Sequence, residues 1–238
     1  MRPIPSNEAA VWLSAAALLA GAGAALFFTS YPDYDLAVSN AFFEVRGRFW
    51  NNSGLVGLAR NFFRAVFIAV ALLAVIGTVV TFWRQRTWLG LDKMRWLYLG
   101  LCLIAGPGLV ANLAFKNEWG RARPSQVTEF GGTKKFTPPL VPSDQCATNC
   151  SFVSGEASSM FAVFFAAAFL FRGWFALWIV AGVAAGAAAG LIRMMQGGHF
   201  LSDVIFAGVF MALTVAILDR VVAHASASKD DRGSHPMT

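Results

Sequence analysis

The segment with the clearest catalytic potential runs from Arg193 to Asp203 and reads RMMQGGHFLSD. Its His199 and Asp203 are four residues apart, so on a helix the two side chains share a face and the carboxylate can fix the tautomer of the imidazole. The other two histidines, His224 and His235, lie in the C-terminal region. A lone histidine is often a hydrogen-bonded structural residue, but the arginine, the glycine pair and the aspartate around this one favour catalysis.

Basic residues cluster in a second segment, KNEWGRARP, which contains Lys116, Arg121 and Arg123. Three cations in eight residues indicate an anion site, and the fork of a guanidinium matches the geometry of phosphate oxygens. Lys134 and Lys135 follow in the same polar stretch, and together with Arg121 they are candidates for further contacts to phosphate or sugar groups of the substrate. The alternative is a charge cluster that ends a membrane helix or anchors lipid headgroups.

A third polar segment contains Ser154, Gly155 and Glu156, directly before an apolar run. A Ser-Gly step at the start of a helix offers backbone N–H groups and the positive end of the helix dipole, which together hold an anion. The alternative is an ordinary helix cap, in which Ser154 is the N-cap and Glu156 the acidic residue of the first turn.

The composition indicates what must position these residues. Of the 238 residues, 57% are hydrophobic and 13% charged, against about 45–50% and about 25% in soluble domains. This excludes a disordered chain and argues against a soluble enzyme. The net charge is +6, but the polar surface is too small for a nucleic-acid binder. Anionic lipid or a phosphorylated substrate is the better class of partner.

A helix needs about 20 apolar residues to cross a bilayer. Runs close to that length occur at 9–29, 65–83, 96–115 and 174–192. Two shorter runs, 157–171 and 204–218, reach that length if they begin at Ser154 and Asp203. We expect an all-α, polytopic membrane bundle of six transmembrane helices in one domain (1–225), followed by a polar, disordered tail (226–238). The first run is longer than the apolar region of a signal peptide, so we expect an uncleaved anchor.

The loop between the second and third runs carries Arg84, Arg86, Lys93 and Arg95. This charge predicts that the loop is cytoplasmic and that all three polar segments face the opposite side. For a bacterial inner membrane that side is the periplasm. Between Pro32 and Trp50, one face of a helix would carry an apolar stripe, as expected for a helix lying at the membrane surface or for a loop that skims it; the stripe is Val38, Phe42, Val45 and Phe49.

Cysteine usage agrees with this orientation. Cys146 and Cys150 are four residues apart in the polar loop, and such a pair forms a local disulfide in an oxidising compartment. In the cytosol they would be free or would bind a metal. That loop holds no further Cys or His to complete a zinc site, so we favour the disulfide.

Taken together, the three segments resemble the signature of the type 2 phosphatidic acid phosphatases, a superfamily that includes the vanadium haloperoxidases. The matching patterns are Lys116-x6-Arg123-Pro124, Ser154-Gly155 and Arg193-x5-His199-x3-Asp203. The resemblance covers roughly residues 60–222. Two positions depart from the family pattern: Glu156 stands where the family usually has histidine, and Ile192 where it usually has serine.

The resemblance implies a helical bundle that cleaves a phosphoryl group from a lipid without a metal or other cofactor. It makes His199 the nucleophile, forming a phosphohistidine, and Asp203 the residue that orients it. It assigns the binding of phosphate to Lys116, Arg123 and Arg193, together with the backbone of Ser154 and Gly155. The family's usual general acid is replaced, and we expect Glu156 to take that role.

The expected substrate is an amphiphilic lipid whose phosphate lies at headgroup level. The Val-Ser-Gly stretch beside a loop with two cysteines resembles the bacterial lipid A phosphatases. Phosphatidylglycerophosphate and undecaprenyl diphosphate phosphatases are close alternatives, and an anion transporter is the alternative outside enzymes. A transporter has no use for the His199–Asp203 pair. The oligomeric state is left open.

Overall fold

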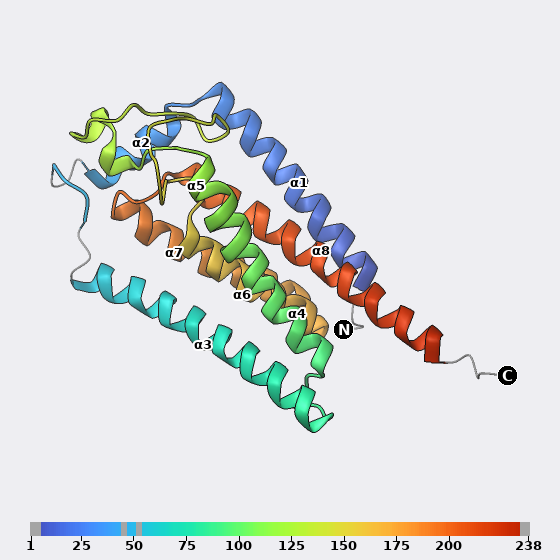
Figure 1. Ribbon diagram of the computed structural model, residues 1–238. Coiled ribbons are helices and arrows are strands. Elements are labelled where there is room, and N and C mark those ends of the chain that lie inside the picture. The colour runs from blue at the N-terminus through green and yellow to red at the C-terminus, as the bar shows by residue number, and fades with distance from the viewer. Residues whose placement is uncertain (1–5, 44–46, 51–53, 234–238) are drawn as a thin grey trace.

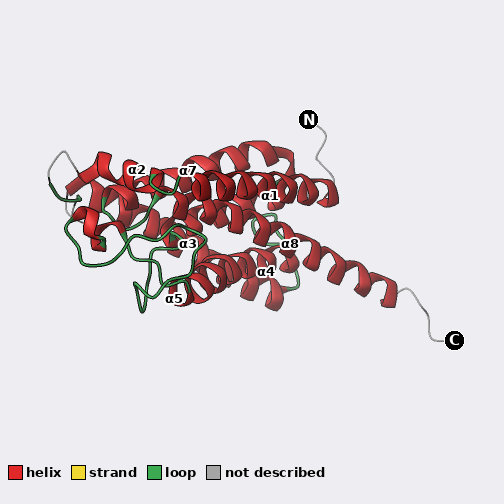
Figure 2. Cartoon of the chain, turned by 90° about the horizontal axis from the view of Figure 1, so that it is seen from above, coloured by secondary structure: helices red, strands yellow, loops and turns green. Residues whose placement is uncertain are grey.

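The computed structural model describes residues 6–43, 47–50 and 54–233, and most of them are helical (Figure 2). Within these residues β-type pairing is limited to two isolated bridges, Trp88 with Leu91 and Val127 with Lys134. The predicted all-α fold is therefore confirmed.

The main helices form an elongated bundle in which α1 and α8 lie side by side (Figure 1). Their bounds are α1 (Ser6–Ser30), α2 (Tyr34–Phe43), α3 (Gly54–Arg84), α4 (Lys93–Leu103), α5 (Lys116–Glu118), α6 (Gly155–Leu170), α7 (Phe175–Met195) and α8 (Leu201–Gly233). Short 3-10 turns form η2 (Pro124–Gln126), η3 (Thr128–Phe130) and η4 (Arg172–Trp174). Since α8 ends at Gly233, it extends into the segment expected as a tail, and the division at residue 225 stays a prediction.

Five helical segments of the described chain are long and apolar enough to cross a bilayer: Glu8–Ser30, Gly54–Arg84, Lys93–Glu118, Arg172–Met195 and Leu201–Ala225. These agree with five of the six predicted runs, and the protein is a multi-pass membrane protein. The remaining predicted run corresponds to α6, which has 16 residues. At 1.5 Å per residue, the length of this helix is less than the thickness of the hydrocarbon core, about 30 Å. The count of six spans therefore stays a prediction.

Small residues on α7 allow close contact with its neighbours. A Cβ atom on Gly182 would come within 2.8 Å of Phe165, and one on Gly186 within 2.5 Å of Phe161, both on α6. At Gly190 it would come within 2.3 Å of Val204 on α8. Because these contacts leave no room for a methyl group, α6 is held between α7 and α8 with most of its side chains buried. The Ser154–Gly155 step begins this central helix.

The segment η1 (Ile104–Phe115), between α4 and α5, is π-helical and contains Pro107. Proline cannot donate a backbone hydrogen bond, so it disturbs the regular α-helical ladder. The side-chain amide of Asn112 donates to the Pro107 carbonyl at 2.7 Å. This π-helical segment directly precedes Lys116.

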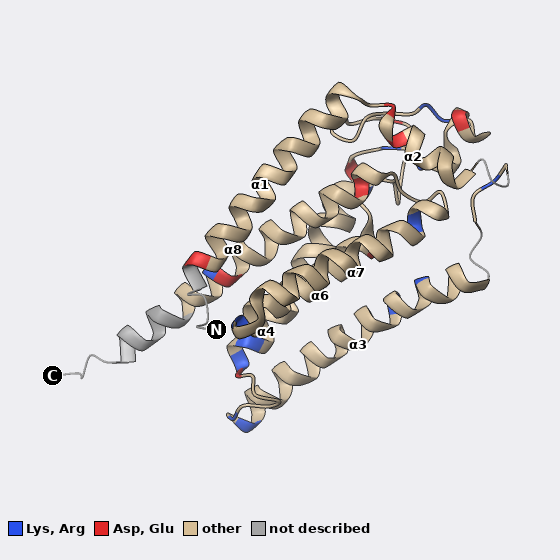
Figure 3. Cartoon of the chain, turned by 180° about the vertical axis from the view of Figure 1, so that it is seen from behind, with Lys and Arg blue, Asp and Glu red and all other residues tan. Residues whose placement is uncertain are grey.

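Loops and short helices gather at one end of the bundle, where α2, the segment between α5 and α6, and the α7–α8 turn meet (Figure 1). Charged residues lie mainly toward the two ends of the bundle (Figure 3). A small second core of Ala122, Val127, Phe130 and Phe200 fixes this end, with Phe43 and Phe49 packed against it.

The predicted surface helix is shorter in the structure. Because α2 ends at Phe43 and the chain forms a turn before Trp50, Val38 and Phe49 do not share one helix. Phe42 packs against the main core, and Phe49 contacts Phe43 and Phe130. The continuous stripe is thus wrong, and Val45 lies outside the described residues.

Candidate active site

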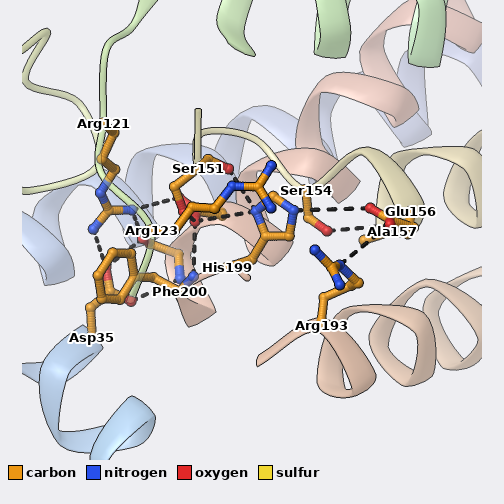
Figure 4. A network of polar contacts seen from close by, with 12 residues as sticks. Asp35, Arg121, Arg123, Ser151, Ser154, Glu156, Ala157, Arg193, His199 and Phe200 are labelled. Carbon is orange, nitrogen blue, oxygen red and sulfur yellow. Dashed lines mark hydrogen bonds and ion pairs between the residues drawn. The ribbon is translucent and has the colours of Figure 1, made fainter. Parts of the chain in front are cut away.

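His199 lies just before α8, with its side chain fully buried (Figure 4). Its Nδ1 atom is 2.7 Å from the Ser151 carbonyl oxygen, which can only accept a hydrogen bond. The Nδ1–H group is therefore the donor, and Nε2 carries the lone pair. Burial lowers the pKa of His199 to about 4, so the imidazole is neutral at neutral pH. Among the described residues, Nε2 has no hydrogen-bond partner.

Asp203, in the first turn of α8, lies behind the imidazole. Its Oδ2 atom accepts from the Ser151 hydroxyl at 2.5 Å and from the Phe200 N–H at 2.8 Å. The same oxygen is 3.6 Å from His199 Nδ1, longer than a hydrogen bond. The predicted pair is thus brought together, but the direct acceptor for the imidazole is the Ser151 carbonyl. Sequence reasoning missed Ser151.

Arg121 is fully buried, which corrects its prediction as a substrate-binding residue. It donates to Asp35 at 2.8 Å, to Asp203 at 2.5 Å and to the Ser202 hydroxyl at 2.8 Å. We call Asp35, Arg121, Ser202 and Asp203 the Arg121 cluster. A buried guanidinium must be paired to offset its desolvation, and these partners do so. Arg121 therefore holds α2 and the start of α8 together.

Three of the predicted phosphate ligands lie near the open face of His199. A Cβ atom on Gly155 would come within 2.9 Å of the Lys116 ammonium, which places this lysine at the start of α6. The Arg193 guanidinium lies against Gly198, where a Cβ would come within 2.5 Å of it. Arg123 donates to the Asn149 carbonyl at 2.7 and 3.1 Å, and Figure 4 shows it beside the His199 group.

Ser154 is the N-cap of α6, with its hydroxyl accepting from the Ala157 N–H at 3.5 Å. Its own backbone N–H donates to the Asp203 carbonyl at 3.2 Å. This N–H is therefore already paired within the protein, and phosphate binding by the Ser154–Gly155 backbone stays a prediction. The positive end of the helix dipole still points at the site from Gly155 onward.

Glu156 lies between two arginines. Its Oε1 atom accepts from Arg60 of α3 at 3.0 and 3.2 Å and is 3.3 Å from Arg193 Nε, while its Oε2 atom is 4.0 Å from His199 Nε2. We call Arg60, Glu156 and Arg193 the Glu156 cluster. Two guanidinium groups stabilise the charged carboxylate, so Glu156 does not hold a proton in this state. Sequence reasoning missed Arg60, which lies near the start of the largely apolar helix α3.

The loop between α5 and α6 carries the remaining predicted residues. Cys146 and Cys150 form a disulfide, as predicted. The Cys150 N–H donates to the Lys116 carbonyl at 3.0 Å, which ties the disulfide to the site. Lys134 and Lys135 are exposed, and their backbone bonds go to neighbouring loop residues rather than to those around His199. Their contact with substrate stays a prediction.

The described residues contain no group of three or more His, Cys, Asp or Glu side chains placed to hold a metal ion. The cations already present, Lys116, Arg123 and Arg193, could supply the positive charge that phosphoryl transfer requires. The predicted independence from metals awaits a direct test.

Known proteins resemble this chain along most of its length. The family model "PAP2 superfamily" matches residues 95–226. The chain is 36% identical over 212 residues to the lipid A 4'-phosphatase of Francisella tularensis subsp. novicida (strain U112), covering 81% of this chain and 88% of that protein. It is 27% identical over 205 residues to the lipid A 4'-phosphatase of Rhizobium leguminosarum, covering 80% and 88%.

A solved structure shares the fold. The crystal structure of a transmembrane PAP2 type phosphatidylglycerolphosphate phosphatase from Bacillus subtilis aligns with a TM-score of 0.52 and 22% identity, covering 91% of this chain and 96% of that one. The family match includes all three predicted segments, from Lys116 to Asp203. An anion transporter is thereby set aside: the chain belongs to the PAP2 superfamily and is a membrane-embedded hydrolase of phosphate monoesters.

Proposed function

We propose that this protein removes a phosphate group from a lipid A-type glycolipid through a phosphohistidine on His199. The observation that carries the proposal is the neutral, buried imidazole whose Nε2 atom has no hydrogen-bond partner among the described residues, with Lys116 and Arg193 close enough to lower its pKa and Arg123 beside it (Figure 4). The substrate class is supported by the 36% identity to a lipid A 4'-phosphatase over most of both chains.

The first chemical step forms a bond from His199 Nε2 to phosphorus and breaks the bond from phosphorus to the lipid oxygen. Negative charge on the equatorial oxygens of the transition state is stabilised by the three cations and by the start of α6. The Ser151 carbonyl holds the Nδ1–H and stabilises the positive charge that develops on the ring. Water then attacks the phosphohistidine, releases inorganic phosphate and restores His199.

Glu156 is proposed to move the proton in both steps. It is a carboxylate in the resting site, because Arg60 and Arg193 hold it. A bound phosphate adds negative charge beside it and draws the cations away, and both effects increase its affinity for a proton. Glu156 then protonates the departing lipid oxygen. In the second step, as a carboxylate again, it accepts a proton from the attacking water.

We further propose that the site end of the bundle faces the periplasm from the inner membrane, at the surface of the outer leaflet. The disulfide supports an oxidising compartment, and the basic loop 84–95 supports a cytoplasmic position for the other end. A membrane-impermeant thiol reagent on intact cells is expected to label Cys146 only after reduction. Labelling of Cys146 only in inverted membrane vesicles would reverse this orientation.

The function is tested by phosphate release from purified protein in mixed micelles. Lipid A is expected to be the best substrate, compared with phosphatidylglycerophosphate and undecaprenyl diphosphate at equal surface concentration. A clear preference for one of those two lipids would replace the proposed substrate. Rapid acid-free quenching with ³²P-labelled lipid is expected to trap an acid-labile, base-stable phosphoprotein, which His199→Ala does not form.

A further inference from the structure

Arg60 reaches the site from a helix outside the residues that the family model matches. It lies near the start of α3, whereas the match begins at residue 95. Its guanidinium donates through both Nε and Nη2 to the same Glu156 oxygen, at 3.2 and 3.0 Å. The Arg60 side chain is 31% exposed and the Glu156 side chain 25% exposed, so the pair is accessible from the site rather than sealed in the core.

The Glu156 carboxylate marks a place where an anion is stabilised beside His199. One of its oxygens lies between Arg60 and Arg193, and the other lies 4.0 Å from His199 Nε2. Two buried nitrogens near this place, Arg193 Nε and His199 Nε2, lack a hydrogen-bond partner among the described residues. A phosphate bound in reach of both atoms would necessarily lie beside the two guanidinium groups that now hold Glu156.

A purely structural reading makes Arg60 a tether that fixes α3 to the bundle. The packing of α3 makes such a tether unnecessary, because the helix is held farther along by a tight contact. At Gly77 a Cβ atom would lie 2.2 Å from the Trp96 ring of α4, so the two helices meet without space between them. A partly exposed ion pair adds little to an interface of this kind.

We propose that Arg60 is a further phosphate-binding residue of this enzyme, held ready by Glu156 until the phosphate group of the substrate takes the place of the carboxylate. After this exchange Arg60 binds the phosphate and no longer pairs with Glu156. Because fewer cations then stabilise the carboxylate, Glu156 can gain a proton. This inference rests on the proposed function. It also explains the departure from the family pattern, because a glutamate at position 156 requires a cation that a histidine would not.

The test measures inhibition by inorganic phosphate with an aryl phosphate as the substrate, so it does not depend on the identity of the lipid. Arg60→Ala is expected to raise the inhibition constant of phosphate about 10- to 100-fold, the range for a charge-assisted hydrogen bond. Arg60→Lys keeps the charge without the fork and should lie between Arg60→Ala and the wild type. The matched control is Arg64→Ala, one turn along α3 and exposed, which should leave the constant unchanged.

The double variant Arg60→Ala/Glu156→Gln separates phosphate binding from neutralisation of Glu156. If Arg60 binds phosphate, the double variant binds it about 10- to 100-fold more weakly than Glu156→Gln alone. Equal inhibition constants for these two proteins would overturn the proposal and leave Arg60 as a partner of Glu156 only. If Arg60→Ala does not fold, as judged by its thermal unfolding, Arg60→Gln takes its place in both comparisons. If the wild-type protein hydrolyses the aryl phosphate but not lipid A, that result counts against the proposed substrate and not against Arg60.

Discussion

Two clusters of arginine and carboxylate lie on opposite sides of His199, and they differ in burial. In the Arg121 cluster, Arg121 and Asp203 have no exposed side-chain surface, and each makes several hydrogen bonds. In the Glu156 cluster the carboxylate is partly exposed and shares one oxygen between Arg60 and Arg193. The same residue types therefore serve a fixed scaffold behind the imidazole and an exchangeable anion site in front of it.

This difference has a physical cause. A fully desolvated ion pair cannot open without leaving a charge unpaired in the protein interior, so its geometry is fixed. A pair in contact with solvent loses little when water or another anion replaces one partner. The Arg121 cluster can thus position Ser151 and His199 reliably, and the Glu156 cluster can release its cations to a phosphate.

The largest effect is expected where the two clusters meet. His199→Ala removes the proposed nucleophile, so phosphate release from lipid should fall by about 10⁴-fold or more. His224→Ala, in the exposed C-terminal part of α8, is the matched control and should keep full activity. Undiminished turnover by His199→Ala would contradict the proposed mechanism. It would also contradict the assignment of one cluster as a scaffold and the other as an anion site.

Removing the central cation of the scaffold tests whether the Arg121 cluster is structural. Arg121→Ala leaves Asp35 and Asp203 buried without their partner, and the expected loss of stability is about 3–5 kcal/mol. The measurement is thermal or denaturant unfolding in detergent. Arg60→Ala is the comparison, with an expected loss of no more than about 1 kcal/mol, because its pair is partly exposed. Equal losses in the two variants would show that burial does not distinguish the clusters.

Glu156 is tested through the leaving group of the substrate. If it protonates the departing oxygen, Glu156→Gln should slow hydrolysis of alkyl phosphates by about 10²–10⁴-fold. Aryl phosphates need no proton on their leaving oxygen, so the burst in which they form the phosphohistidine should change much less, whereas hydrolysis of that intermediate slows for both kinds of substrate. An equal loss of the burst rate for both kinds of substrate would assign Glu156 to binding rather than to protonation of the leaving oxygen.

The pH dependence tests the scaffold side of His199. The pKa of this residue is lowered to about 4, and only the neutral imidazole attacks phosphorus. His199 should therefore remain nucleophilic when the pH falls below about 6.5, the pKa of an unperturbed histidine. It should lose its nucleophilicity as the pH falls through about 4. Histidine NMR titration checks this directly, with His224 as an internal reference. A midpoint for His199 near 6.5 would contradict the buried, neutral imidazole.

The residues of the two clusters also show what the sequence could and could not predict. The apolar runs predicted the helices. The spacings within the polar segments predicted His199, Lys116 and Arg193 as site residues, and the folded chain brings these residues together. Arg121 and Arg123 stand two residues apart in one basic segment, and nothing local indicates that only the first is buried. Its partner Asp35 is 86 residues away in sequence, and Arg60 is 96 residues from Glu156. Such pairings are set by the packing of α2 and α3, which periodicity does not encode.

The smallest effect is expected at the disulfide, which lies just outside the Arg121 cluster. Replacing both cysteines by serine opens a closed loop of about five residues, and the entropy of loop closure at that length corresponds to about 2 kcal/mol. Activity should fall less than about tenfold, because the loop is fixed independently: the Ser151 N–H donates to the Arg121 carbonyl at 2.9 Å and its hydroxyl to Asp203. Thermal unfolding and aryl phosphate turnover of Cys146→Ser/Cys150→Ser measure the two effects. If turnover falls by much more than tenfold, the disulfide and not the buried ion pairs positions Ser151, and with it the carbonyl that orients His199.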